Sequence, residues 1–156
     1  GGGPQISKML ERLGIKSEFV NGVRVTTKDM IDIVEMVLCG SINKEVVSAI
    51  NACGGVGLGL SGKDANLIKA KKMRKTHKET DSNIERILDL GWVGMPDVIN
   101  GDFFDALEST PVIPVIAPVG FDDESNTYNI NADNVAGAIA SELEASKLIL
   151  RVLPKH

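Results

Sequence analysis

Hydrophobic residues recur along the chain at two spacings, which predicts a protein built from both helices and strands. Spacings of three and four residues, bounded by glycine, proline and capping residues, predict helices over residues 4–13, 27–40, 41–53 and 132–143. Short apolar runs predict strands over residues 56–60, 66–69, 112–119 and 147–152. Asn21-Gly22 predicts a tight hairpin over residues 18–25, and a second hairpin is expected around residues 122–126.

Several residues set the expected ends of these elements. Gly40 is expected to end one helix and Ser41 to cap the next. The polar stretch 71–81 predicts a solvated loop. Pro114 and Pro118 lack a backbone donor and therefore favour a short strand within the apolar run 112–119. Because strands alternate with helices, the order of elements predicts an α/β fold, a three-layer α/β/α sandwich with a mostly parallel central sheet.

Composition narrows the class of protein. A length of 156 residues with 43% hydrophobic content predicts one globular domain. The 17 basic and 21 acidic residues give a net charge of -4, which argues against nucleic acid or an anionic membrane as the main partner. The apolar runs are too short to cross a bilayer, so we expect a cytoplasmic protein. Cys39 and Cys53 lack zinc-site spacing and are expected to be buried thiols.

A glycine-rich stretch, residues 54–62, resembles two nucleotide-binding motifs. Gly57, Gly59 and Gly62 match the pattern GxGxxG, and residues 57–63 match the start of a P-loop. A P-loop needs Ser or Thr where Asp64 stands, and both motifs need a helix to open at the glycines. We favour neither motif, because the segment that follows predicts a strand. A dinucleotide-binding protein stays as an alternative hypothesis, and it predicts a helix directly after Gly62.

Polar residues gather before the last predicted helix. Asn131 or Asp133 suits the capping position of that helix. Alternatively, Asn129 and Asn131 are two residues apart, so in extended backbone their amides point to one side. With Asp133 they would then converge at a helix N-terminus, where anions are favoured. Arg24, on the second arm of the first hairpin, offers a planar fork that suits a carboxylate, although an exposed strand arginine is more often solvated.

Taken together, the sequence resembles the acetylglutamate kinases of the amino acid kinase family. The matching segments follow the family order across nearly the whole chain, which is more specific than any single motif. They are residues 1–5, 21–26, 34–38, 43–44, 60–64, 114–120 and 128–133. The chain departs from the family at Gly57 and Gly59, in the strand predicted over residues 56–60. Family members usually carry Ala-Val or similar residues in that strand.

The resemblance implies a reaction and a set of residues. The reaction is phosphorylation of the γ-carboxylate of N-acetyl-L-glutamate, with ATP and Mg²⁺, early in arginine biosynthesis. Backbone N–H groups of the Gly1-Gly2-Gly3 turn, with Gly1 and Gly2 as substrate-binding residues, would approach the γ-carboxylate. Arg24 would hold the α-carboxylate, and Asn129 would hydrogen-bond the substrate. Asp133 matches the family aspartate that organises the catalytic lysines.

The resemblance also bears on completeness and association. We expect residues 1–156 to form a single incomplete amino acid kinase domain, mainly the acceptor-substrate lobe, without the nucleotide lobe or the two catalytic lysines. Such a fragment is expected to be inactive alone, with most of the ATP site absent. The alternative is a stand-alone module that binds acetylglutamate or a partner without catalysis. Family members join through apolar helices, so we expect a homo-oligomer, a dimer or larger.

Overall fold

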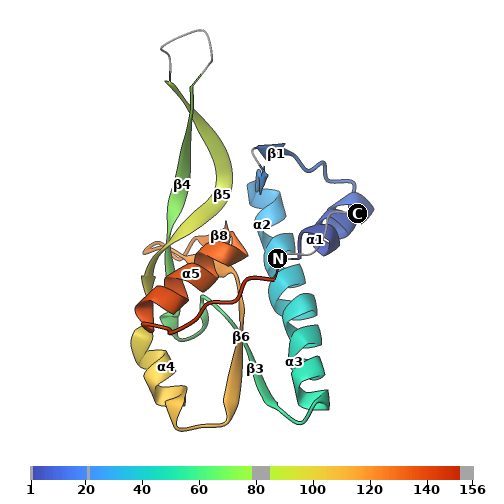
Figure 1. Ribbon diagram of the computed structural model, residues 1–156. Coiled ribbons are helices and arrows are strands. Elements are labelled where there is room, and N and C mark those ends of the chain that lie inside the picture. Colours follow the sequence, from blue (N-terminus) through green and yellow to red (C-terminus); the bar gives the residue numbers. More distant parts are fainter. Residues whose placement is uncertain (1, 21, 79–84, 152–156) are drawn as a thin grey trace.

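The computed structural model describes residues 2–20, 22–78 and 85–151 of the chain (Figure 1). Helices and strands alternate along it, as the sequence predicts. The elements are α1 (Gly3–Arg12), β1 (Phe19–Val20), β2 (Val23–Arg24), α2 (Lys28–Glu35), the π-helical segment η1 (Met36–Ile42), α3 (Asn43–Ala52), β3 (Val56–Ser61), the 3₁₀ turn η2 (Asp64–Asn66), β4 (Ile68–Lys78), β5 (Glu85–Ile99), α4 (Gly101–Glu108), β6 (Val112–Ala117), β7 (Val119–Phe121), β8 (Thr127–Ile130) and α5 (Ala132–Glu142).

The strands form three groups. β1 and β2 make the predicted hairpin, and β3 pairs in parallel with β6. In the third group, β4 pairs with β5, β5 with β8, β8 with β7, and β7 with β4, so that these four strands close into a ring. Parallel pairs join β5 to β8 and β4 to β7, whereas the hairpins β4–β5 and β7–β8 are antiparallel. The α/β fold with parallel strands is therefore confirmed, as is the second hairpin around residues 122–126.

A continuous helical rod replaces the two helices that the sequence predicts over residues 27–53. α2, η1 and α3 follow one another without a break, and Met36 and Ile42, at the junctions, keep right-handed helical backbone angles. The predicted stop at Gly40 and cap at Ser41 are therefore wrong. Burial of Val37 and Leu38 against the core outweighs the local preference of glycine to end a helix. The Ser41 hydroxyl donates to the Glu45 carboxylate instead, at 3.1 Å.

The loop predicted over residues 71–81 is also wrong, at least for residues 71–78, which belong to β4. Figure 1 shows β4 and β5 as a long ribbon that leaves the body of the protein. Backbone ladder bonds to β5 hold residues 71–78 in the ribbon even though most of their side chains are polar. Ion pairs between the strands add to them: the Nζ atoms of Lys71 and Lys72 lie 2.7 and 3.0 Å from carboxylate oxygens of Asp97 and Asp89.

Two further strand predictions need correction. The run 112–119 is split, because β6 ends at Ala117 and β7 begins at Val119, on either side of Pro118. Residues 147–151 form no strand, and Ile149 is 81% exposed. An apolar run becomes a strand only where a neighbouring edge accepts its backbone hydrogen bonds, and no described strand pairs with this one. Residue 152 lies outside the described part.

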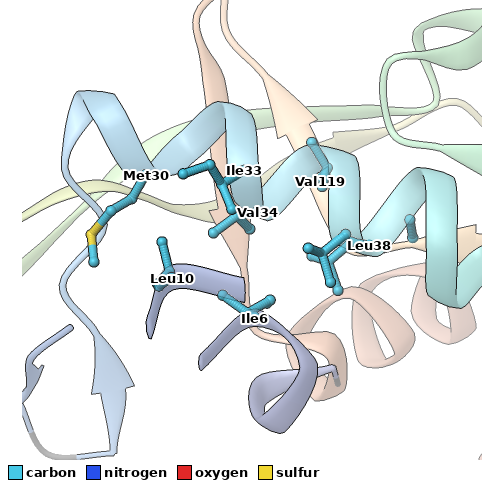
Figure 2. Packing of buried hydrophobic residues seen from close by; sticks show 9 residues of the cluster. Ile6, Leu10, Met30, Ile33, Val34, Leu38 and Val119 are labelled. Carbon is cyan, nitrogen blue, oxygen red and sulfur yellow. The ribbon is translucent and has the colours of Figure 1, made fainter. Parts of the chain in front are cut away.

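The core has two clusters. The first packs α1 against the rod, together with the end of β6 and the start of β7 (Figure 2). It consists of Ile6, Leu10, Met30, Ile33, Val34, Val37, Leu38, Ala117 and Val119. The second joins the strand ring to α5, and Trp92 packs against it with its ring centroid 5.7 Å from that of Tyr128. Cys39 is half-buried and Cys53 is exposed, so the expectation of two buried thiols is wrong for Cys53. None of the described helices is both long and apolar enough to cross a membrane.

Candidate functional site

A cavity of about 290 Å³ lies where the first hairpin, the start of α1 and the start of α5 meet. Arg24, Asn129 and Asp133 all line it, although more than 100 residues separate the first from the other two. The full lining consists of Gly3, Ile6, Phe19, Gly22, Val23, Arg24, Met73, Val93, Asn129, Ile130, Asn131, Ala132 and Asp133. The fold therefore brings together three polar residues that the sequence singles out.

Arg24 is held firmly at one wall of this cavity. Its side chain is 6% exposed, and its Nη2 donates to the Gly3 carbonyl at 3.0 Å and to Ser7 Oγ at 2.8 Å. Nη1 donates to Ser17 Oγ, and the guanidinium lies 4.5 Å from the centroid of the Phe19 ring. Burial lowers the pKa of the Arg24 side chain, but arginine stays charged at neutral pH.

These contacts leave part of the guanidinium available. The group has five N–H donors, and the described residues accept three of them. The Nε–H group and one N–H group of Nη1 remain for an incoming acceptor, and they lie on different edges of the guanidinium. The expectation that an isolated strand arginine is solvated is wrong here, because the hairpin turns Arg24 inward onto α1.

Thr26 connects the arginine to the opposite wall. It is fully buried, its hydroxyl donates to the Arg24 carbonyl at 3.2 Å, and the Asn129 amide donates to that hydroxyl at 3.2 Å. Its backbone pairs with β5, because Thr26 N donates to Leu90 O at 3.0 Å and Trp92 N donates to Thr26 O at 2.7 Å. Thr26 therefore fixes the separation between the hairpin and β8.

The start of α5 resolves the two interpretations of the asparagines. Asn131 caps the helix, since its Oδ1 accepts the backbone N–H groups of Asp133 and Asn134 at 2.9 and 3.2 Å. These two donors are consequently not free for an anion. Asn129, two residues before Asn131, is half-buried and faces Thr26, whereas Asp133 is exposed at the edge of the cavity.

The glycine turn borders the same cavity. Gly2 is the capping residue of α1 and Gly3 is its first residue, and Gly3 lines the cavity whereas Gly2 does not. Pro4 follows as the sequence predicts. Gly1 lies outside the described residues.

The glycine-rich stretch 54–62 forms no nucleotide site of the predicted kinds. Gly62 is followed by the 3₁₀ turn η2 and then by β4, so the dinucleotide-binding alternative, which requires a helix there, is wrong. The Asp64 carboxylate instead accepts hydrogen bonds from the backbone N–H and hydroxyl of Ser61, at 2.6 and 2.8 Å. Across the described residues, no three His, Cys, Asp or Glu side chains gather closely enough to hold a metal ion.

Sequence reasoning missed four residues of the site: Ser7, Ser17, Phe19 and Thr26. One signal was available for Thr26, because it lies two positions after Arg24 in extended backbone and so points to the same side. The two serines and Phe19 carry no such local signal, since only the folding of the hairpin onto α1 brings them to the guanidinium.

The chain is similar to known proteins over nearly its whole length. Residues 1–151 match the model of the amino acid kinase family. Acetylglutamate kinases from Parvibaculum lavamentivorans and Rhodospirillum centenum are each 55% identical over 150 residues, which is 96% of this chain and 49% of theirs. The chain thus spans about half the length of the curated relatives it matches.

Two solved structures share the fold. The crystal structure of smu.665 from Streptococcus mutans has a TM-score of 0.81 at 28% identity, covering 97% of this chain and 57% of that one. N-acetylglutamate synthase from Neisseria gonorrhoeae, complexed with coenzyme A and N-acetyl-glutamate, has a TM-score of 0.61 at 18% identity, covering 93% and 31%. The second likeness concerns the fold alone.

Proposed function

The chain belongs to the amino acid kinase family, and we propose that it supplies the acceptor-binding part of an acetylglutamate kinase. The reaction transfers a phosphoryl group from ATP to the γ-carboxylate of N-acetyl-L-glutamate, in arginine biosynthesis in the cytoplasm. The observation that carries the proposal is the convergence of Arg24, Asn129 and Asp133 on one cavity beside the glycine turn. The names of the relatives support the choice of substrate.

The cavity suits an acidic amino acid derivative. The positive charge of Arg24 attracts the α-carboxylate, and a remaining N–H donor can form a charge-assisted hydrogen bond to one of its oxygens. Asn129 adds an amide at the opposite wall, and its link to Thr26 fixes the side-chain orientation. Apolar side chains of Ile6 and Val93 complete the lining and keep bulk water away from the acyl group.

The γ-carboxylate then lies toward the start of α1. Helix N-termini favour anions, and the glycine turn admits close approach of an oxygen to backbone N–H groups. Gly1 and Gly2 belong to this proposed contact by family resemblance. Asp133, exposed at the cavity edge, is placed to orient a cationic side chain from the rest of the protein rather than to bind the carboxylates.

Phosphoryl transfer also needs charge neutralisation around the transferring group, which lysines and Mg²⁺ usually supply. Arg24 is the one cation among the described residues that line the cavity. We therefore assign no residue of this chain to Mg²⁺ and propose that the ATP site lies mostly in parts of a longer protein. By family resemblance, we also propose that the chain associates into a dimer or a larger homo-oligomer.

Direct binding tests the function. Isothermal titration of the chain with N-acetyl-L-glutamate is expected to show one site, and Arg24→Ala is expected to weaken it by about 1.5–3 kcal/mol, because a charge-assisted hydrogen bond is lost. Arg24→Lys should recover only part, since a point charge does not reproduce the planar fork. Arg74→Ala, an exposed arginine of β4 outside the cavity, is the matched control.

Arg24 also bridges three residues of the fold, so loss of binding must be separated from unfolding. Circular dichroism of each variant gives the folded fraction at the titration temperature. With the remaining lobe of a relative joined to the chain, Arg24→Ala should raise KM for acetylglutamate and leave KM for ATP nearly unchanged. Equal rises for both substrates, or no binding by the original chain, would contradict the proposal. Binding by the chain without turnover in the joined protein would favour the stand-alone binding module.

A further inference from the structure

The helical rod contains an unusual segment at its centre. η1 (Met36–Ile42) is π-helical over seven residues, between α2 and α3. Such segments are rare, are less well packed than α-helix, and occur frequently at functional sites. No proline lies in the segment to force this geometry. The side chains of Leu38 and Ile42 show which part of the protein the segment contacts.

η1 packs directly against the glycine turn. Gly2 has a φ of +71°, and a Cβ atom added to it would lie 2.5 Å from Ile42 Cδ1 and 2.8 Å from Leu38 Cδ2. The two side chains therefore fill the space that any other residue at position 2 would need. Figure 2 shows Leu38 reaching toward Ile6 of α1, so the same contact continues into the first core cluster.

The glycine turn in turn sets the position of Arg24. Gly3 follows Gly2 directly, and its carbonyl accepts a hydrogen bond from Arg24 Nη2 at 3.0 Å. Gly2 is anchored as the first acceptor of α1, because Ile6 N donates to its carbonyl at 3.0 Å. A shift of the turn by a fraction of an ångström would therefore move one of the acceptors that hold the guanidinium.

We propose that η1 positions Arg24 through the Gly2–Gly3 turn, with Leu38 and Ile42 as positioning residues. Leu38 and Ile42 are four residues apart, so their side chains lie on the same face of the rod and meet at Gly2. The identity of the ligand in this inference rests on the proposed function, whereas the positioning of Arg24 does not.

Substitutions at the contact test the inference. Gly2→Ala adds the clashing Cβ, and Ile42→Val removes Cδ1, the nearest atom to it. Ile33→Val is the matched control, because it deletes the same methyl group from a buried residue of the same cluster that makes no close contact with Gly2. The five proteins to compare with the original chain are Gly2→Ala, Ile42→Val, Ile33→Val, Gly2→Ala with Ile42→Val, and Gly2→Ala with Ile33→Val.

Two readouts separate positioning from general stability. The first is the Arg24 Nε–H resonance in ¹⁵N NMR spectra, which reports the surroundings of the guanidinium without any ligand. The second is the dissociation constant for N-acetyl-L-glutamate. Gly2→Ala is expected to shift the Arg24 resonance and weaken binding by about tenfold, because strain at such a site is worth on the order of a factor of ten in an equilibrium. Adding Ile42→Val should recover part of both changes, and adding Ile33→Val should recover neither.

Each remaining outcome decides the matter. Equal recovery by Ile42→Val and Ile33→Val would overturn the inference, as would an unchanged Arg24 resonance in Gly2→Ala. If Gly2→Ala does not fold, the single variants still decide, since Ile42→Val must shift the Arg24 resonance more than Ile33→Val does. If the original chain binds no acetylglutamate while the resonance follows the expected pattern, the proposed function fails and the positioning role stands.

Discussion

An alanine at Gly59 tests how closely α3 approaches β3. A Cβ at this position would overlap Asn43 Oδ1 and crowd the end of the Lys44 side chain. The lysine end is free to move, but Asn43 is 4% exposed and its Nδ2 donates to Leu60 O at 3.2 Å and to Val115 O at 2.7 Å. The amide thus links the rod to both strands of the parallel pair, and an alanine at position 59 must displace it.

The size of the effect follows from those contacts. Displacing a buried amide leaves polar groups without full partners, at about 1–3 kcal/mol, and overpacking adds a similar amount. Because relaxation recovers part of each, Gly59→Ala is expected to lower the free energy of unfolding by about 2–4 kcal/mol. Strand propensity alone predicts the opposite sign, since glycine weakens a strand.

Urea unfolding followed by circular dichroism measures the change. Gly137→Ala is the control, because Gly137 lies within α5 and an added Cβ would meet no atom within 4 Å. That substitution should stabilise the protein by about 0.5–1 kcal/mol. A higher midpoint for Gly59→Ala with an unchanged denaturant slope would refute the packing argument.

Four further outcomes are expected. Burial and the hydrogen bond that its hydroxyl donates to Asp122 raise the pKa of Tyr128 to about 12, so absorbance of the only tyrosine should titrate near that pH, and Asp122→Asn should lower the value. The raised pKa of Tyr128 contributes folding stability that is fully present below pH 10 and is lost as the pH rises toward 12. Titration of Tyr128 near pH 10 would contradict this prediction. A thiol reagent should modify exposed Cys53 before Cys39, whose pKa burial raises to about 11, and equal rates would contradict this. The chain alone should show no ATP-dependent phosphorylation of acetylglutamate in a hydroxamate assay, and turnover that depends on Asp133 would show otherwise. Light scattering at micromolar concentration should give a dimer or larger species, because unpaired sheet edges favour association, and a monodisperse monomer would rule this out.

Local chemistry made part of the fold predictable. The hairpin at residues 18–25 follows from Asn21-Gly22, and the helix after Pro4 follows from its apolar spacing and Gly14. Asn131 caps α5 because its side chain satisfies donors within its own neighbourhood. In each case the residues that decide the conformation lie within a few positions of one another, so the sequence contains all the information that is needed.

The predictions that are wrong concern segments whose conformation depends on residues far away in the sequence. Gly40 continues a helix because distant residues bury Val37 and Leu38 beside it, and the polar segment 71–78 forms a strand because β5 supplies its hydrogen-bonding partner. The apolar run 147–151 has no described partner strand. The hydrophobic pattern therefore indicates which segments favour burial or strand pairing. Whether such a segment finds a packing surface or a neighbouring strand depends on the long-range arrangement of the fold.

The candidate site combines both kinds of information. The types of residue at Arg24 and Asn129 indicate carboxylate and hydrogen-bond recognition from the sequence alone, but their separation depends on Thr26, whose hydroxyl connects them and whose backbone pairs with β5. The buried Thr26 hydroxyl accepts a hydrogen bond from Asn129 and donates one to the Arg24 carbonyl. A movement of the hairpin is therefore transmitted to β8. The chain of hydrogen bonds from Arg24 through Thr26 to Asn129 joins the two walls of the cavity. Because the Thr26 backbone also pairs with β5, the distance between these walls is set by the sheet and not by the ligand. A site needs such a fixed distance to select one length of substrate.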